Sequence, residues 1–166
     1  GIAPQGAVYA HRDFLWRVSS ATVDLDVSDF TALPDYDRLI STLEGEIDLT
    51  HNGGEALHLA PYGIHRFDGG WQTRSLGRCR DFNLMMRKGA CEGRMEAVPV
   101  PGQLTVGGRP NDTAILYCGQ GQVTVCVGSD TVTLSQGQSL KVESAEDVTL
   151  CLSGHGCILL AEAWYD

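Results

Sequence analysis

The sequence has few basic residues: 12 Lys and Arg stand against 21 Asp and Glu, which gives a formal net charge of -9. Proteins that bind nucleic acids need basic surface to displace the counterions of the phosphates. The same excess of acidic residues argues against docking on an anionic membrane. The longest aliphatic stretch, Cys157–Ala161, is far too short to span a bilayer. We therefore expect neither a nucleic acid nor a membrane among the partners.

The first ten residues have no basic start and no apolar segment, so the sequence predicts no secretory signal. Cysteine is present at six positions, but no pair has the CxxC spacing. Most of these cysteines lie in strand-like apolar runs, where a reduced cysteine packs as a small hydrophobic residue. They are Cys118, Cys126, Cys151 and Cys157. We therefore expect reduced, buried thiols and a cytoplasmic location.

No window of the sequence shows the 3.6-residue apolar period of an amphipathic helix. Short runs rich in β-branched and aromatic residues alternate instead with Gly, Asn, Asp and Pro. Phe14–Asp24 and Cys79–Arg87 are such runs in the first half, as are Thr113–Cys118 and Cys157–Trp164 in the second. This spacing is typical of a β-sandwich or barrel. The sequence therefore predicts an all-β fold.

The two halves of the sequence resemble each other. Leu43–Leu49 matches Gly119–Val125, and Asp81–Leu84 matches Cys157–Leu160. The match predicts a duplicated small β-barrel, with a first unit over 1–98 and a second over 99–166; both can still form one compact body. The boundary follows from Pro99 and Pro101, because proline disfavours central strands.

At matched positions the first copy has polar residues where the second has small or apolar ones. The pairs are Asp37 and Thr113, Arg38 and Ala114, Asp81 and Cys157, and Asn83 and Leu159. In a strand, Asp81, Asn83 and Met85 point to one face. This pattern indicates either a polar pocket for a small ligand or, equally well, a solvent-facing strand or a structural Arg–Asp pair.

Several sequence blocks are similar to those of a known family. They are Trp16–Ser19, Leu33–Arg38, Leu43–Gly45, Phe67–Gly69 and Asp81–Met85. Their order resembles the HutD/Ves pattern of WRIS, FPGxDR, LEG, FDG and DFNxM, and it covers about half of the chain. The resemblance implies a bicupin: two fused cupin-like barrels of jelly-roll type with little helix. It also implies an association with histidine utilisation and stress, and a regulatory protein that binds a formylated or acidic amino acid.

The sequence departs from the family pattern at two places. The usual PWxNGG-like segment before the first block has no counterpart in Gly1–His11, and Leu33 and Asp35 replace Phe and Gly of FPGxDR. Two alternatives follow: either the chain is truncated relative to the family, or its pocket is completed differently.

The resemblance and the contrast between copies together predict non-catalytic binding of a small carboxylate-bearing metabolite in the first unit, with no cofactor. Arg17 and Arg38 would hold the acidic group, because a guanidinium grips a carboxylate with two parallel hydrogen bonds. Asn83 and Asp81 would orient the ligand. The full set of candidate residues is Arg17, Ser19, Asp37, Arg38, Phe67, Asp68, Asp81, Asn83 and Met85.

Two other functions stay open. A metal-dependent cupin isomerase or oxygenase would use His51, Glu55 and His65, but the second histidine of the usual cupin motif is missing after Gly45, and a metal ion normally takes three or four ligands. We therefore expect no metal. An oligomeric scaffold is the other alternative, since Phe82, Leu84 and Met86 share a strand face that suits a homodimer interface.

Overall fold

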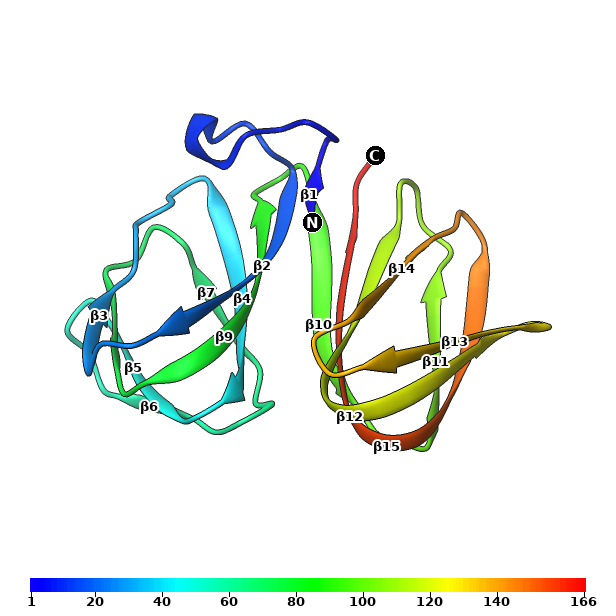
Figure 1. Ribbon diagram of the computed structural model, residues 1–166. Helices are drawn as coiled ribbons and strands as arrows, with labels where there is room; N and C mark the ends of the chain where they lie inside the picture. The colour runs from blue at the N-terminus through cyan, green and yellow to red at the C-terminus, as the bar shows by residue number, and fades with distance from the viewer. The chain divides into compact units, whose positions relative to one another are not determined.

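The computed structural model describes every residue from Gly1 to Asp166, and 63% of them lie in strands (Figure 1). The one helical element is the short 3-10 helix η1 (Tyr9–His11). The all-β fold with little helix predicted from the sequence is confirmed. No helix is long and apolar enough to cross a membrane. The chain divides into two compact units, Gly1–Cys91 and Glu92–Asp166.

The first unit is a sandwich of two antiparallel sheets. The five-stranded sheet has the order β1 (Ile2–Ala3), β2 (Trp16–Val23), β9 (Cys79–Arg87), β4 (Tyr36–Glu44) and β7 (His65–Asp68). The four-stranded sheet has the order β3 (Val27–Asp29), β8 (Thr73–Leu76), β5 (Ile47–His51) and β6 (Leu57–Leu59). Side chains from both sheets form one apolar cluster that includes Ile40, Leu49 and Phe67. Strand alternation thus places one face of each sheet inside the unit.

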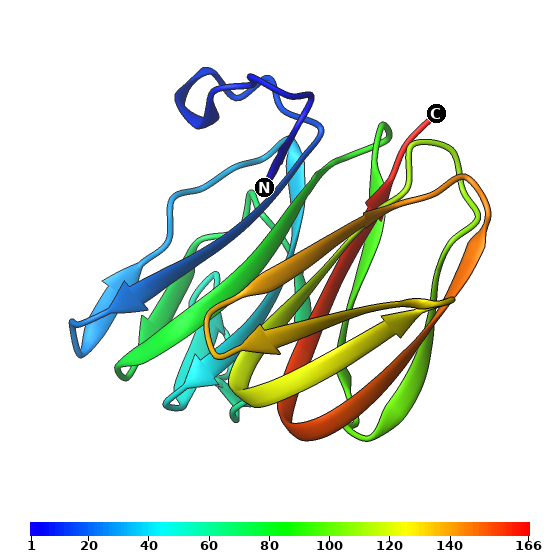
Figure 2. The same ribbon diagram turned by 45° about the vertical axis from the view of Figure 1, so that its right-hand side comes forward.

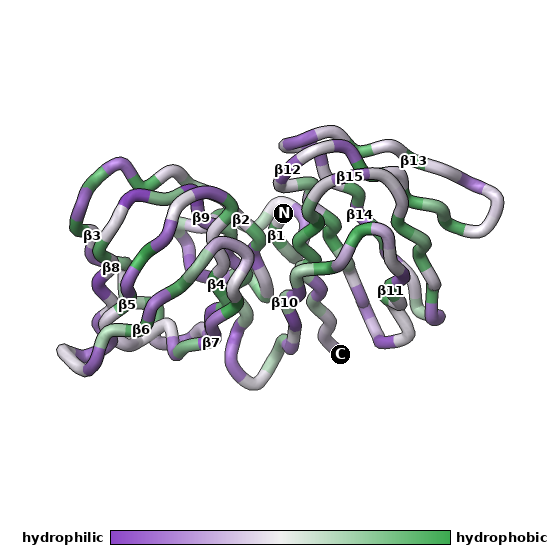
Figure 3. The backbone as a smooth tube through the Cα atoms, turned by 90° about the horizontal axis from the view of Figure 1, so that it is seen from below, coloured by the Kyte–Doolittle hydropathy of each residue, from purple (hydrophilic) through white to green (hydrophobic).

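The second unit is built around two long strands, β12 (Thr113–Val127) and β15 (Asp147–Trp164), which pair along most of their length. The remaining strands flank this pair. They are β10 (Glu92–Val98) and β11 (Gly102–Gly107) beside β15, and β13 (Asp130–Ser135) and β14 (Ser139–Glu143) beside β12. Hydrophobic and hydrophilic residues alternate along the strands (Figure 3). Only apolar residues form the enclosed cluster, among them Leu116, Val125 and Leu160.

The bend of the long strands depends on glycine. The ladder between β12 and β15 shifts register between Cys118 and Gln120, and Gly121 follows with a φ of 77°. A Cβ at Gly121 would lie 2.2 Å from the carbonyl oxygen of His155, so no other residue fits this position without displacing the backbone. Figure 2 shows that both long strands bend along their length.

The start of the second unit differs from the sequence-based boundary. β10 pairs with β15 from Glu92 to Val98, so this strand belongs to the second sheet system. The division therefore falls after Cys91, before the prolines that marked the predicted boundary. Proline ends a strand as readily as it marks a linker, and Pro99 here follows the last residue of β10.

Strand registers match the two units position by position. The ladder between β4 and β9 shifts between Thr42 and Glu44, just as the ladder between β12 and β15 shifts between Cys118 and Gln120. Aligning these shifts makes Asp81 equivalent to Ile158 and Asn83 equivalent to Leu160. The sequence comparison had paired each with the residue one position earlier, because a one-residue difference between the units leaves no signal in such faint similarity. The same register makes Arg17, Arg38 and Met85 equivalent to Arg94, Ala114 and Glu162.

Candidate functional site

Most of the predicted ligand-binding residues lie together on the inner face of the five-stranded sheet. One row across neighbouring strands consists of Arg17, Met85, Arg38 and Phe67. The next row contains Ser19 and Asn83, and the third contains Asp81. Directly opposed residues of an antiparallel sheet share a face. The structure therefore brings these residues into one region inside the first unit.

Asp37 and Asp68 are exceptions, because they lie on the opposite face of this sheet. They are paired with each other across β4 and β7. The Asp37 carboxylate accepts a hydrogen bond from Arg66 at 3.2 Å, and Asp68 lies 2.8 Å from the Lys88 ammonium group. The hydrogen bond from Lys88 lowers the pKa of Asp68, with help from the Gly70 amide. The inclusion of Asp37 and Asp68 in the pocket was wrong, since side chains alternate along a strand and each neighbours an inward residue.

Arg38 is at the centre of the inward residues. Its side chain is 6% exposed. Nη2 donates a hydrogen bond to Oδ1 of Asn83 at 3.1 Å, whereas Nε is buried without a partner. The guanidinium carbon lies 5.0 Å from the ring centre of Phe30 and 5.2 Å from that of Phe67. Burial lowers the pKa of Arg38, and the positive charge of Arg17 lowers it further.

Asp81 is the buried acid of this site. Its Oδ1 accepts a hydrogen bond from the Ala21 amide at 2.9 Å. Burial raises the pKa of Asp81, while the Ala21 amide, Asn83 and Arg38 act in the opposite direction. The carboxyl group is therefore an acceptor held in place by its surroundings. Two arginines and one buried acid leave the region with an excess of positive charge.

The segment before β2, which contains η1, covers one end of the first unit (Figure 1). The Tyr9 ring lies 4.0 Å from the guanidinium carbon of Arg12 and 4.3 Å from that of Arg17. It also packs against the cluster of Phe14, Leu33, Tyr36 and Met85. Sequence reasoning missed Tyr9, since nothing in Gly1–His11 matched the family pattern.

A cavity of about 500 Å³ lies beside these residues. Its lining comprises Asp29, Phe30, Ala32, Thr50, Gly53, Gln72, Thr73 and Arg74. Phe30 contacts the Arg38 guanidinium from this side, so the cavity and the buried arginine share one wall. The sequence analysis did not identify Phe30, because a single aromatic residue in a loop carries no periodic signal.

His51 and His65 lie behind Thr73, one of the residues that line the cavity. Their Nε2 atoms are 2.9 Å apart, and Nδ1 of His51 is 2.8 Å from the Thr73 hydroxyl. Burial lowers the pKa of both histidines, and for His51 the neighbouring His65 adds to the effect. When both rings are neutral, the Nε2–H group of one histidine donates a hydrogen bond to the unprotonated Nε2 of the other. The sequence analysis brought these two histidines together only as ligands in its metal-binding alternative.

The metal-binding alternative is not supported by this arrangement. Glu55 is exposed after the turn that follows β5 and does not join the two histidines. His58 lies on β6, where it contacts Asp48 and Glu46. No group of three His, Cys, Asp or Glu side chains is placed to hold a metal ion. Of the alternative set of His51, Glu55 and His65, only the two histidines meet.

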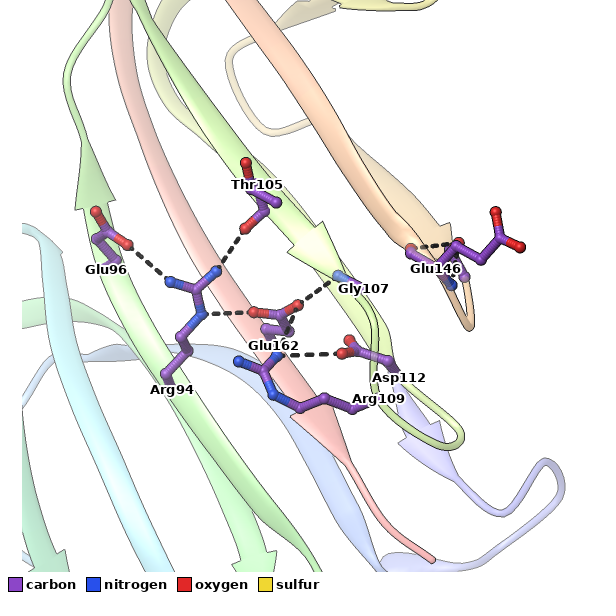
Figure 4. Close-up of polar contacts among 9 residues, drawn as sticks. Arg94, Glu96, Thr105, Gly107, Arg109, Asp112, Glu146 and Glu162 are labelled. Atoms are coloured by element: carbon purple, nitrogen blue, oxygen red, sulfur yellow. Dashed lines mark hydrogen bonds and ion pairs between the residues drawn. The ribbon is translucent and has the colours of Figure 1, made fainter.

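The second unit has its own buried charged cluster, centred on Glu162 (Figure 4). This side chain is fully buried. Its carboxylate accepts hydrogen bonds from Arg94 at 2.5 Å and from the Gly107 amide at 2.9 Å, and it lies 3.5 Å from Arg109. Asp112 accepts a further hydrogen bond from Arg109 at 3.2 Å. Burial and the neighbouring Glu162 raise the pKa of Asp112 to about 6.

Comparison with known proteins decides the family. The HutD family model matches residues 2–160, nearly the whole chain. The chain belongs to the HutD family. Membership and fold together support a cupin-like protein linked to histidine utilisation. No curated protein sequence matches the chain.

Solved structures of HutD-like and cupin proteins share the fold. A conserved protein of unknown function from Pseudomonas aeruginosa, PA5104, has a TM-score of 0.77 at 26% identity, over 92% of this chain and 81% of that one. HutD from Pseudomonas fluorescens, solved in a formate condition, has a TM-score of 0.74 at 23% identity, over 92% and 80%. A cupin 2 conserved barrel domain protein from Leptotrichia buccalis has a TM-score of 0.60 at 8% identity, over 92% and 84%.

Proposed function

We propose that this HutD-family protein binds a small carboxylate-bearing metabolite, of the formylated or acidic amino acid class, inside its first unit. Binding would serve a regulatory role linked to histidine utilisation, without a catalytic step. The observation that carries the proposal is the buried Arg38 guanidinium, whose Nε lacks a partner while Arg17 adds a second positive charge nearby. A buried polar group without a partner costs free energy, which a bound carboxylate would recover.

The second unit supports this proposal, because it contains a carboxylate, that of Glu162, at the position equivalent to Met85 of the first unit. Glu162 lies opposite Arg94 there, just as Met85 lies opposite Arg17 in the first unit. In the second unit the protein supplies the anion that pairs with its arginines. In the first unit the equivalent side chain is an uncharged thioether. A ligand carboxylate beside Met85 would complete the set of charges that the second unit completes by itself.

The remaining inward residues suit the rest of such a ligand. Asn83 and Asp81 offer an amide and a carboxyl group within the same region. Together they would bind the N–H and C=O of a formylated amino group, or the N–H donors of a free amino group. Phe67 and Phe30 form an apolar wall on either side of the Arg38 guanidinium. The cavity lined by Phe30 and Thr73 would give such a ligand its route from solvent.

Calorimetry tests the proposal with N-formyl-L-glutamate, L-glutamate and the neutral analogue L-glutamine. We expect the acidic compounds to bind more tightly than glutamine. Replacing Arg38 with Met should weaken binding by about ten- to one-hundred-fold, since a hydrogen bond to a charged group contributes about 1.5–3 kcal/mol.

Arg66 provides the matched control, because it lies in the neighbouring strand but pairs with Asp37 on the outer face. The Arg66→Met variant should bind as the unmodified protein does. Equal binding by the Arg38→Met and Arg66→Met variants, or binding of glutamine equal to that of glutamate, would refute the role assigned to Arg38.

A further inference from the structure

The outer face of the second unit contains two cysteines that oppose each other on neighbouring strands. Cys126 on β12 and Cys151 on β15 are direct partners in the antiparallel ladder. Both are free thiols; Cys151 is exposed and Cys126 is partly exposed. Their neighbours Val125, Leu150 and Leu152 are buried, so the two thiols point outward. The expectation that these cysteines pack as buried hydrophobic residues was therefore wrong.

Opposed residues on antiparallel strands have the spacing that a disulfide requires. Their Cα atoms lie about 4.5 Å or 5.5 Å apart, depending on the type of pair. A disulfide accepts Cα separations of about 4.4–6.8 Å. Both types of pair thus satisfy the Cα requirement for a bond between Cys126 and Cys151 in the observed register. Closing the bond needs only a small approach of the two Cβ atoms, which lie about 4.5–5.5 Å apart in opposed pairs. Figure 2 shows β12 and β15 side by side in this part of the unit.

The remaining cysteines of this unit lack such a partner. Cys118 is buried and opposes Ile158, while Cys157 opposes Gln120. A hydrogen bond from Nε2 of Gln103 to Sγ of Cys151, 3.8 Å long, helps to hold the Cys151 side chain in place. Gln103 is its partner on the other side, just as Thr131 is the partner of Cys126. The two cysteines are thus the central pair of a polar row that crosses four strands.

We propose that Cys126 and Cys151 form a reversible cross-strand disulfide when the protein meets a low-molecular-weight disulfide. One thiolate attacks a sulfur of the oxidant, forms a mixed disulfide and releases one thiolate. The second cysteine thiolate then attacks the protein sulfur of the mixed disulfide and displaces the second small thiolate. The two protons lost by the cysteines end on the released thiols. The protein loses two electrons, and the oxidant gains them.

Oxidised glutathione is the probe, applied to the full chain under native conditions. We expect the thiol count of the denatured product to fall by two from the six cysteines of the sequence, and its mass to fall by two hydrogen atoms. Digestion should yield one peptide pair that links Cys126 to Cys151. Dithiothreitol should restore both thiols.

Single substitutions distinguish a bond between these two cysteines from unspecific reaction of any exposed thiol with glutathione. Cys126→Ser and Cys151→Ser should stop at one glutathione adduct on the remaining thiol, whereas Cys157→Ser should still form the bridge. The proposal is overturned if the unmodified protein retains stable glutathione adducts on Cys126 and Cys151 without bridging. It is also overturned if the bridge joins any other two cysteines.

Discussion

The two units share one strand register but differ in how they fill the same inner positions. The first unit has Arg38, Asp81 and Asn83 where the second has Ala114, Ile158 and Leu160. In the second unit these three residues are completely or almost completely buried in the apolar cluster. One inner position shows the reverse difference, since Met85 of the first unit corresponds to Glu162 of the second. The two units therefore share one strand arrangement but place their buried charged side chains at different inner positions.

This comparison shows that arginine needs a partner in either unit. Arg94 and Arg109 surround a carboxylate that the second unit provides, and the Gly107 amide completes its hydrogen bonds. Arg17 and Arg38 have no equivalent of Glu162, and Nε of Arg38 is buried without a partner. A fully satisfied charged cluster holds a structure in one arrangement, whereas an incomplete one favours a ligand that completes it. The second unit thus indicates which charge the proposed ligand would supply to the first unit.

Removing the anion of the second unit should have the largest effect. Glu162→Ala removes the buried carboxylate that Arg94 and Arg109 share and leaves the Gly107 amide without its acceptor. We expect a loss of about 1–3 kcal/mol in the free energy of unfolding, because both arginines are partly exposed and still pair with Glu96 and Asp112. Urea denaturation measures this loss. The control is Glu96→Ala, because Glu96 also pairs with Arg94 but is exposed; its cost should stay below about 1 kcal/mol. Equal costs for the two variants would contradict the central place of Glu162.

A smaller, pH-dependent effect is expected at Asp112. Its pKa in the folded protein is raised from 3.8 to about 6, so the folded state binds the proton more tightly than the unfolded state does. Its contribution to stability is present below pH 3.8 and is lost as the pH rises through about 6. Asp112→Asn retains the shape but removes the titration. The stability of this variant relative to the unmodified protein should therefore increase over that range.

Thermal unfolding of both proteins at a series of pH values measures this difference. The variant should gain relative stability as the pH rises and then level off above the folded-state pKa of Asp112. A difference that does not change with pH would show that folding does not raise the pKa of Asp112.

The sequence predicted the fold well because strand signals are local. Alternation in Cys79–Arg87 and glycine-rich turns are visible without any knowledge of tertiary structure. The inward set of Arg38, Asp81 and Asn83 followed from the same alternation together with the family resemblance. The same alternation would have excluded Asp37 and Asp68 from the pocket: each is adjacent in sequence to an inward residue, so its side chain points to the opposite face.

The parts of the site that were missed depend on long-range pairing. His51 and His65 meet because β5 and β7 belong to facing sheets, and no local pattern reports that approach. Tyr9 reaches Arg17 through a segment without regular strands. Glu162 lies within an apolar strand, and its significance appears only when strand registers align it with Met85. These contacts come from tertiary packing and irregular backbone, which composition and periodicity do not encode.

Substitution of Met85 tests the comparison most directly. A glutamate there would place a carboxylate opposite Arg17, as Glu162 lies opposite Arg94, and the protein would then supply its own anion in both units. Calorimetry with N-formyl-L-glutamate should detect no binding to the folded Met85→Glu variant, while the uncharged Met85→Gln variant continues to bind. Binding to Met85→Glu as tight as that to the unmodified protein would contradict the account.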